Sequence, residues 1–273
     1  MEKQDPSPSS DMLSESAPAH DRLPERILGI PFFTGTVVEA VEQHRRNGGY
    51  VVIPAAPALI KLNYDEGYRR AMQKADMAIA DSGLLVLLWR LATGRKLQNI
   101  SGITYLKALL ADRRLGESES SFWVMASPDA RDKALGWLGG RGVRIEERDC
   151  YVAERTPSSS DDYKLLSQIE ERRPADIVIA VAGGAQEKLA LYLRECLLWR
   201  PRIHCVGAAL DFLSGAERAI PEWAERTHLG WLSRLAAQPR MFFPRVGIAL
   251  ALARMVFKHR SEMPPLRQRW SDL

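Results

Sequence analysis

Residues 175–210 read ADIVIAVAGGAQEKLALYLRECLLWRPRIHCVGAAL, and this stretch decides the fold. Its first part, 175–184, is a strongly apolar run closed by two glycines, which predicts a buried strand followed by a turn. Residues 185–198 have the apolar spacing of a helix, and residues 202–210 form a second apolar run. Because the two runs are continuously apolar rather than alternating, their strands are expected to be parallel and covered on both faces.

The same alternation of apolar runs and helical patterns continues along the rest of the chain. Further strands are predicted over residues 27–33, 50–55, 76–81, 121–127 and 143–152. Further helices are predicted over residues 36–49, 64–75, 83–94, 101–116, 129–142 and 159–174. This order predicts an α/β fold, with a parallel sheet flanked by helices. Ligands of such folds bind at the carboxyl ends of the strands, so residues that end strands are the first candidates for a site.

The composition is that of a globular protein kept in a reducing compartment. With 273 residues, the chain is long enough for one large domain or two smaller lobes. Its three cysteines, Cys150, Cys196 and Cys205, are too few and too scattered for a disulfide framework. They also lack the CxxC spacing and the neighbouring histidines of a structural zinc site. We expect a cytoplasmic protein whose thiols fill the core.

The N-terminal segment, residues 1–26, is expected to form a disordered tail. It is rich in Ser and Pro, contains no aromatic residue and lacks the apolar core of a signal peptide. Such a segment buries too little apolar surface to offset the entropy that it would lose on ordering.

The positive charge of the chain is concentrated at its C-terminal end. Residues 226–270 contain nine Lys or Arg and a single acid, Glu262, so this segment has a net charge of +8. Because the whole chain has a net charge of +4, the other residues together carry −4. A basic segment of this kind suits an anionic partner. Nucleic acid is disfavoured as that partner, because no stacking platform or base-reading motif accompanies the charge.

Residues 231–260 combine several of these arginines with Trp, Phe and Leu. The uninterrupted apolar part, 246–253, is much shorter than the roughly 20 residues of a membrane-spanning helix. Pro239 and Pro244 are expected to break the segment into short helices. The pattern indicates an amphipathic segment that lies on an anionic membrane surface. The alternatives are a basic helical hairpin packed on the domain and a contact between copies of the chain.

Asp81 is a charged residue at a strand end. It lies between the apolar run 77–80 and the helical pattern of residues 83–94. A carboxylate at the carboxyl end of a strand, with apolar residues on both sides, is placed like a general base. The alternative is structural, because Asp is also a preferred N-cap that accepts hydrogen bonds from the start of the next helix.

Gly183 and Gly184 end a second strand. Two glycines permit a tight turn and allow helix N–H groups to approach an anion closely, although such a turn is often only structural. The sequence around them is neither GxGxxG nor a P-loop, which argues against a dinucleotide or nucleoside-triphosphatase site. Gln186 and Glu187 follow in the first helical turn, where they either bind a sugar or base or only solvate the helix start.

A third strand ends at Gly207, and Asp211 follows inside an apolar helical turn. A buried acid costs several kcal/mol unless it is hydrogen-bonded. Asp211 therefore either caps a neighbouring helix or binds a ligand.

The segment VGAALDFLSGAERAIPEWAERTHLGWLSRLAAQPRMFFPR, residues 206–245, resembles the C-terminal signature of the TagA/WecG/CpsF-type glycosyltransferases. That signature runs Gly-x-x-x-Asp-Phe-x-x-Gly, Arg-Ala-Pro-x-Trp, Leu-x-Trp-Leu-x-Arg-Leu and Pro-Arg, and the chain keeps most of it between Asp211 and Arg240. GGAQEK at 183–188 and ADSGLLVLLWRLATGR at 80–95 also resemble family motifs, in the same order and with similar spacing.

The resemblance implies a Rossmann-like glycosyltransferase domain over residues 27–225 and a basic, membrane-associating appendage over residues 226–273. It implies that an inverting enzyme moves a sugar from a UDP-sugar donor to a polyprenyl-diphosphate-linked saccharide in cell-surface or exopolysaccharide synthesis. No metal and no cofactor are required in that scheme. The enzyme would lie on an anionic membrane surface, at the inner face of the plasma membrane, and it could form homo-oligomers as relatives do.

Carried over position by position, the resemblance makes Asp81 the general base. The positions that it assigns to donor binding are Gly183, Gly184, Gln186, Glu187, Gly207 and Asp211. The candidates for binding the diphosphate of the donor or of the lipid carrier are Arg234, Arg240 and Arg245.

The chain departs from the family pattern at three places around the expected pocket. Ile53-Pro54-Ala55 stands where the family has Thr-x-Asn, Gly102-Ile103-Thr104 where it has Gly-x-Asp, and Ala126-Ser127 where it has Gly-Gly. A buried hydrogen bond to substrate is worth ~1–3 kcal/mol, so the donor sugar is expected to differ from the usual N-acetylmannosamine. The alternative hypothesis is a catalytically weakened relative that acts as a membrane-docked scaffold in a polysaccharide assembly complex.

Overall fold

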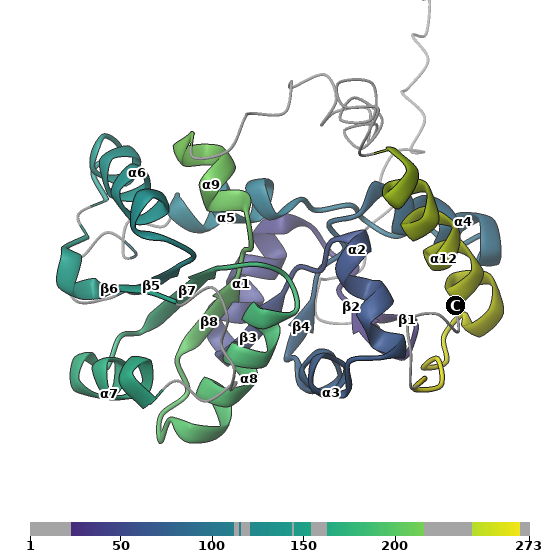
Figure 1. Cartoon of the computed structure of the whole chain (residues 1–273), viewed down its shortest axis with the longest axis horizontal. Helices are drawn as coiled ribbons and strands as arrows, with labels where there is room; N and C mark the ends of the chain where they lie inside the picture. Colours follow the sequence, from purple (N-terminus) through teal and green to yellow (C-terminus); the bar gives the residue numbers. More distant parts are fainter. Residues whose placement is uncertain are drawn as a thin grey trace, which may run out of the picture.

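The computed structural model describes residues 23–111, 115, 121–143, 145–153, 163–215 and 242–267. Within these residues one sheet of eight strands has the order β1-β2-β4-β3-β8-β7-β5-β6, and helices cover it (Figure 1). Every neighbouring pair is parallel except β1 with β2. The predicted α/β fold with a mostly parallel sheet is therefore confirmed, whereas residues 1–22, most of the predicted tail, lie outside the described residues.

The elements are short and follow the predicted alternation. The strands are β1 Glu25–Ile27, β2 Ile30–Phe32, β3 Gly49–Val52, β4 Met77–Ala78, β5 Ser121–Met125, β6 Cys150–Val152, β7 Asp176–Ala180 and β8 Arg202–Cys205. The helices of the first half are α1 Val37–Asn47, α2 Ala56–Leu59, the 3₁₀ turn η2 Ile60–Asn63, α3 Glu66–Lys74, α4 Gly83–Thr93 and α5 Gly102–Leu110. The later ones are α6 Pro128–Gly139, η4 Glu147–Asp149, α7 Tyr163–Arg172, α8 Ala185–Cys196, α9 Ala209–Ser214 and α12 Phe242–His259.

The sheet is built from two halves that meet in its middle. Strands β1 to β4 form one half and β5 to β8 the other, and the halves join where β3 pairs with β8, with Val52 opposite Cys205. Because β4, β3, β8 and β7 are adjacent and parallel, their carboxyl ends lie side by side at one edge of the sheet. This edge is where an α/β fold offers its ligand site.

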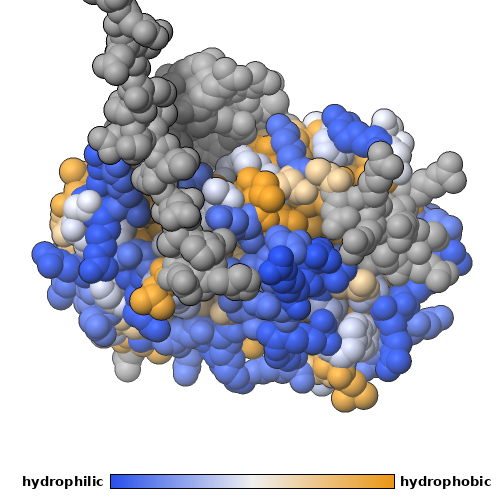
Figure 2. All heavy atoms as spheres, turned by 180° about the vertical axis from the view of Figure 1, so that it is seen from behind, coloured by the Kyte–Doolittle hydropathy of each residue, from blue (hydrophilic) through white to orange (hydrophobic). Residues whose placement is uncertain are grey.

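Each face of the sheet has its own apolar core. In β7, Ile177 and Ile179 belong to one cluster, whereas Val178 and Ala180 belong to the other. The first cluster includes buried residues of α3, α4, α7, α8 and α12, and the second includes those of α1, α5, α6 and α9. The outer surface seen from behind is largely hydrophilic, with one apolar group in the upper middle and smaller apolar patches towards the left and lower edges (Figure 2).

Many helices begin where short polar residues precede them. A side chain directly before the helix accepts a hydrogen bond from an amide three residues further on. These N-caps are Thr36 before α1, Asp65 before α3, Ser82 before α4, Ser101 before α5 and Ser127 before α6. At the other end of α4, Gly94 adopts φ 74°, the left-handed conformation that glycine tolerates best.

The predicted strand over residues 27–33 is instead a β-hairpin. Ile27 pairs with Ile30 in antiparallel register, and the two residues between them form the turn. Leu28 and Gly29 both have positive φ, 50° and 78°, as a two-residue hairpin of right-handed twist requires. The apolar character of residues 27–33 conceals this reversal, since Ile27, Leu28 and Ile30 are buried on both sides of the turn and within it.

Three other expectations need correction. The strand predicted over residues 143–152 contains only Cys150–Val152, because η4 occupies the residues directly before it. Pro244 does not break the C-terminal segment, since it lies in the first turn of α12, where no amide is needed for an intrahelical bond. Of the thiols expected to fill the core, Cys205 is buried, Cys150 is half-buried and Cys196 is exposed.

The C-terminal helix α12 is packed into the core. Leu252, Met255 and Val256 are at most 4 % exposed, and the helix packs against α4, α2 and η2. The chain beyond α12 is tied down as well, through Leu28 N to Arg260 O at 2.7 Å, Gly29 N to Ser261 O at 2.9 Å and Arg267 N to Asn63 O at 2.5 Å. In the described part of the chain, no helix combines the length and the apolar character that crossing a membrane demands.

Candidate active site

Asp81 lies at the carboxyl edge of the sheet, three residues beyond the end of β4. Its side chain is half-buried, and its Oδ1 accepts a hydrogen bond from Gly102 N at 3.2 Å, in the first turn of α5. The predicted alternative, an N-cap role on α4, is wrong, because Ser82 takes that place by accepting from Leu85 N at 3.2 Å. Asp81 is thus held by the start of a different helix.

Gly102 brings the end of β4 close to the end of β8. A Cβ placed on Gly102 would lie 3.4 Å from Val206 O, 3.4 Å from the Ala209 Cβ and 3.9 Å from the Asp81 Oδ2. A side chain here would press on the β8–α9 connection. Glycine at position 102 therefore allows the Asp81 loop and the β8–α9 connection to pack together.

The turn between β7 and α8 is organised by its own side chains. Gly184 has φ 98°, and its N–H donates to the Glu187 Oε2 at 2.5 Å. Gln186 Nε2 donates to the other carboxylate oxygen of Glu187 at 3.2 Å, and Gln186 Oε1 accepts from Gly207 N at 2.8 Å. Gln186 thus links the turn after β7 to the turn after β8.

Gln186 and Glu187 are buried rather than open to solvent. They are 2 % and 0 % exposed, respectively. Burial raises the pKa of the Glu187 carboxyl group, and hydrogen bonds from Gly184 and Gln186, together with the charge of Lys61, oppose that shift. The contacts of Gln186 and Glu187 hold the turns after β7 and β8 together. Binding of the donor by these two side chains therefore stays a prediction.

The other predicted site residues are placed as follows. Gly207 begins the turn after β8 with φ 57°, and Asp211 is half-buried in the first turn of α9, close to Gly207 in sequence. Arg234 and Arg240 lie outside the described residues. Arg245 belongs to the first turn of α12, where the structure describes the backbone alone.

The structure thus brings Asp81, the Gly183-Gly184 turn and Gly207 to one edge of the sheet. Contacts run continuously from Asp81 through Gly102 to Val206, and from Gly207 through Gln186 to the turn after β7. A carboxylate and two glycine-containing turns at the carboxyl ends of neighbouring parallel strands form an arrangement that can bind a ligand and move a proton.

Lys61 is a residue of this edge that the sequence reasoning missed. It lies in η2, and its Nζ donates to Gly183 O at 2.7 Å. Residues 56–63 were assigned to no element, because a four-residue helix followed by a 3₁₀ turn is too short to show a period. Pro57 near the start of α2 was the available signal.

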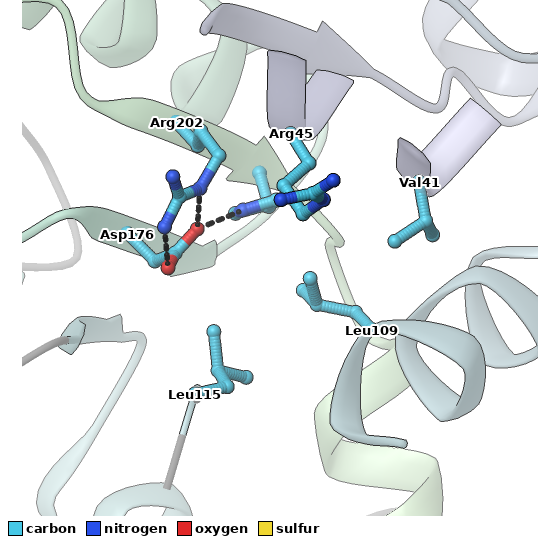
Figure 3. Close-up of a pocket in the computed structure, with 7 residues that line it drawn as sticks. Val41, Arg45, Leu109, Leu115, Asp176 and Arg202 are labelled. Carbon is cyan, nitrogen blue, oxygen red and sulfur yellow. Dashed lines mark hydrogen bonds and ion pairs between the residues drawn. The ribbon is translucent and has the colours of Figure 1, made fainter. Parts of the chain in front are cut away.

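A separate pocket lies at the opposite, amino edge of the sheet (Figure 3). Asp176 at the start of β7 is bound by Arg202 through two contacts, 2.7 and 2.6 Å long, and by His204 at 3.0 Å. The space left is about 30 Å³, and its walls are completed by Val41, Arg45, Leu109 and Leu115. Because its main polar groups already pair with one another, this pocket is a structural feature and not the candidate active site.

The described residues contain no cluster of three or more His, Cys, Asp or Glu side chains suited to holding a metal ion. The residues gathered at the carboxyl edge include the half-buried carboxylates of Asp81 and Asp211, the buried carboxylate of Glu187 and the ammonium of Lys61. These are groups for proton transfer and anion binding.

The structure thus combines an α/β fold with a candidate site at the carboxyl edge of its mostly parallel sheet. The model of the family described as "Glycosyl transferase WecG/TagA/CpsF family" matches residues 25–265, and the chain belongs to this family. It is therefore an enzyme that transfers a sugar, from a family that makes cell-surface polysaccharides. A comparison with curated proteins gives no match.

Proposed function

We propose that the enzyme transfers a sugar from a UDP-sugar donor to a polyprenyl-diphosphate-linked saccharide, without a metal and with inversion at the anomeric carbon. The observation that carries the proposal is the position of Asp81. Its half-buried carboxylate lies at the carboxyl edge, held by Gly102 N and joined through packed contacts to the turns after β7 and β8.

Asp81 acts as the general base in this scheme. It takes the proton of the acceptor hydroxyl while that oxygen attacks the anomeric carbon of the donor. The bond from that carbon to the diphosphate breaks, and UDP leaves with the electron pair. The negative charge that develops on the diphosphate needs cations, for which Arg234, Arg240 and Arg245 are the candidates.

The donor binds over the turns after β7 and β8. Gly183, Gly184 and Gly207 form these turns, and Asp211 follows close by in the sequence. Gln186 and Glu187 serve this pocket by fixing the shape of both turns. Ile53 is buried and Ala55 offers no polar side chain at the end of β3, which supports a donor sugar other than N-acetylmannosamine.

The acceptor is carried by a lipid, so the enzyme also needs a membrane surface. The adjacent helices α4 and α12 both expose large apolar side chains, with Leu87 50 %, Leu91 65 %, Leu250 66 % and Phe257 48 % exposed. Exposed cations lie on the same helices, at Arg90, Arg254 and Lys258. These seven residues form the α4–α12 surface, whose chemistry suits an anionic membrane at the inner face of the plasma membrane.

Transfer by the purified full-length enzyme tests the role of Asp81. UDP release is measured with UDP-sugars and a membrane extract that supplies lipid-linked acceptors. Asp81→Asn keeps the shape and removes the base, so we expect a loss of about 10²–10⁴-fold in the rate of transfer. The matched control Asp129→Asn, at an exposed position of α6, should leave the rate unchanged.

Undiminished transfer by folded Asp81→Asn would reject the proposed base. A second candidate function, a membrane-docked scaffold with weakened catalysis, is favoured by the apolar residues Ile53 and Ala55 at the end of β3. That function predicts vesicle binding without UDP release from any UDP-sugar, whereas the enzyme releases UDP only when donor and acceptor are both present.

A further inference from the structure

Lys61 lies directly against the turn between β7 and α8. Its Nζ donates to Gly183 O at 2.7 Å and would clash with a Cβ placed on Gly184. Ala58, one turn earlier, lies 3.4 Å from the position of a Cβ on Gly183. The α2–η2 segment thus packs over both glycines, and any side chain on Gly184 would displace the Lys61 ammonium.

The turn itself has few amides left for an anion. Gly184 N donates to Glu187, and the amides of Ala185 and Gln186 both donate to Ala182 O. The start of α8 is therefore largely satisfied from within, unlike a phosphate-binding helix start that leaves its N–H groups open. An anionic ligand at this turn must be held mainly by side-chain cations.

Two lysines lie near the turn, and they differ in their partners. Lys188 of α8 forms an ion pair with Asp65 at 3.1 Å. Lys61 contacts the neutral carbonyl oxygen of Gly183 and, within the part of the chain that the structure describes, has no salt bridge. An ammonium has three N–H donors, so the Lys61 side chain keeps capacity for an anionic partner.

We propose that Lys61 binds the diphosphate of the nucleotide donor at the Gly183-Gly184 turn. This inference rests on the proposed function and adds to it a donor-binding residue from the first half of the chain. When the donor arrives, the ammonium moves from the carbonyl oxygen of Gly183 to a phosphate oxygen. A lysine on a flexible four-carbon stem is suited to that change, because it acts as a mobile point charge.

Calorimetric titration of the full-length protein with uridine, UMP and UDP tests this contact. Lys61→Met keeps most of the side-chain volume and removes the charge, so UDP should bind about tenfold more weakly while uridine binds as before. Lys61→Arg should recover most of the UDP affinity, since it restores the charge. The control Lys107→Met, at an exposed position of α5, should bind all three ligands like the unaltered protein.

Comparing the affinities for uridine and UDP distinguishes a charge contact between Lys61 and phosphate from an effect of Lys61 on packing. A distorted turn in Lys61→Met would weaken uridine and UDP alike, and that result would overturn the proposal, as would unchanged UDP affinity. Either result leaves a protein that still binds UDP, so the proposed transfer reaction would survive. If the unaltered protein binds no UDP at all, both the UDP donor and the role of Lys61 are rejected.

Discussion

At the scale of single residues, Asp176 is the clearest titratable group. Burial would raise the pKa of its carboxyl group, but hydrogen bonds from Arg202 and His204 outweigh burial and lower the pKa from 3.8 to about 2. Because this pKa is lower in the folded than in the unfolded state, the ionised Asp176 carboxylate stabilises the fold above about pH 5. That stabilisation is lost as the pH falls through about 4 towards 2, and it amounts to about 2 kcal/mol.

Asp176→Asn should therefore cost stability in a pH-dependent way. We expect its unfolding free energy at pH 6 to be lower than that of the unaltered protein by about 2 kcal/mol or more. Urea unfolding followed from pH 6 to pH 2 should show the difference shrinking. The exposed Asp129→Asn serves as the control. A difference that stays constant with pH would contradict the proposed pairing of the charged carboxylate.

The position of Asp81 shows how far single residues could be predicted. The order of apolar run, acid and helix placed it correctly at the end of a strand. Its helix partner could not be predicted, because Asp81 and Ser82 are both good N-caps and sit side by side. Only the packing of α5 against the β8–α9 connection decides that Asp81 bonds to Gly102 and Ser82 caps α4.

At the scale of elements, α5 connects the two edges of the sheet. Its first turn binds Asp81 through Gly102 N, and one turn later the Tyr105 hydroxyl forms a 2.9 Å hydrogen bond with His204 Nδ1. His204 in turn contacts Asp176. This buried chain of hydrogen bonds fixes α5 against β7 and β8, and so fixes the amide that holds Asp81.

Replacing Tyr105 by Phe should loosen this anchor. Both partners are buried, so removing the hydroxyl leaves His204 Nδ1 without its partner, and the unfolding free energy should fall by about 1–3 kcal/mol. Tyr68→Phe is a matched control, because Tyr68 is equally buried and its hydroxyl has no hydrogen-bond partner among the described residues. Equal losses for the two variants in urea unfolding would show that the hydrogen bond to His204 contributes nothing.

Elements were predictable where they are long and periodic. The pattern located the starts of α4, α5 and α8 to within one residue, because each has an apolar face and a capping residue or glycine turn at its start. The end of α5 was predicted at residue 116, whereas the helix ends at Leu110. The β1–β2 hairpin and η2 were missed for a physical reason. Each element has three or four residues, too few to show a period, and burial makes strand and turn equally apolar.

At the scale of the whole molecule, the alternation of strands and helices predicted a site at the carboxyl edge, and Asp81 and the Gly183-Gly184 turn both lie at that edge. The strand order could not be predicted from the sequence, because β3 pairs with β8, which lies about 150 positions later in the chain. For residues 231–260, packing on the domain was predicted only as an alternative to a membrane-surface segment, and α12 does pack into the core. Because Leu252, Met255 and Val256 anchor that helix in the core, its exposed face has a fixed place beside α4.

Because α12 has a fixed place beside α4, the proposed membrane binding should involve both helices. Leu87→Glu on α4 and Leu250→Glu on α12 each exchange an exposed apolar side chain for a negative charge, so neither should disturb the core. Burying one such side chain in a membrane is worth about 1.5–3 kcal/mol, so each variant should bind anionic vesicles at least about tenfold more weakly in sedimentation assays. The stability of both variants should match that of the unaltered protein.

Leu198→Glu is the matched control, because Leu198 is 93 % exposed and lies between α8 and the start of β8, outside the α4–α12 surface. It should bind vesicles like the unaltered protein. If Leu250→Glu weakens vesicle binding but Leu87→Glu does not, the lipid contacts α12 alone, and the proposal that α4 belongs to the membrane-binding surface is rejected. If the two variants instead dissociate an oligomer in sedimentation velocity and leave vesicle binding intact, these helices form a contact between copies of the chain. Weakened vesicle binding by both variants, with the control unaffected, would orient the enzyme with α4 and α12 on the membrane.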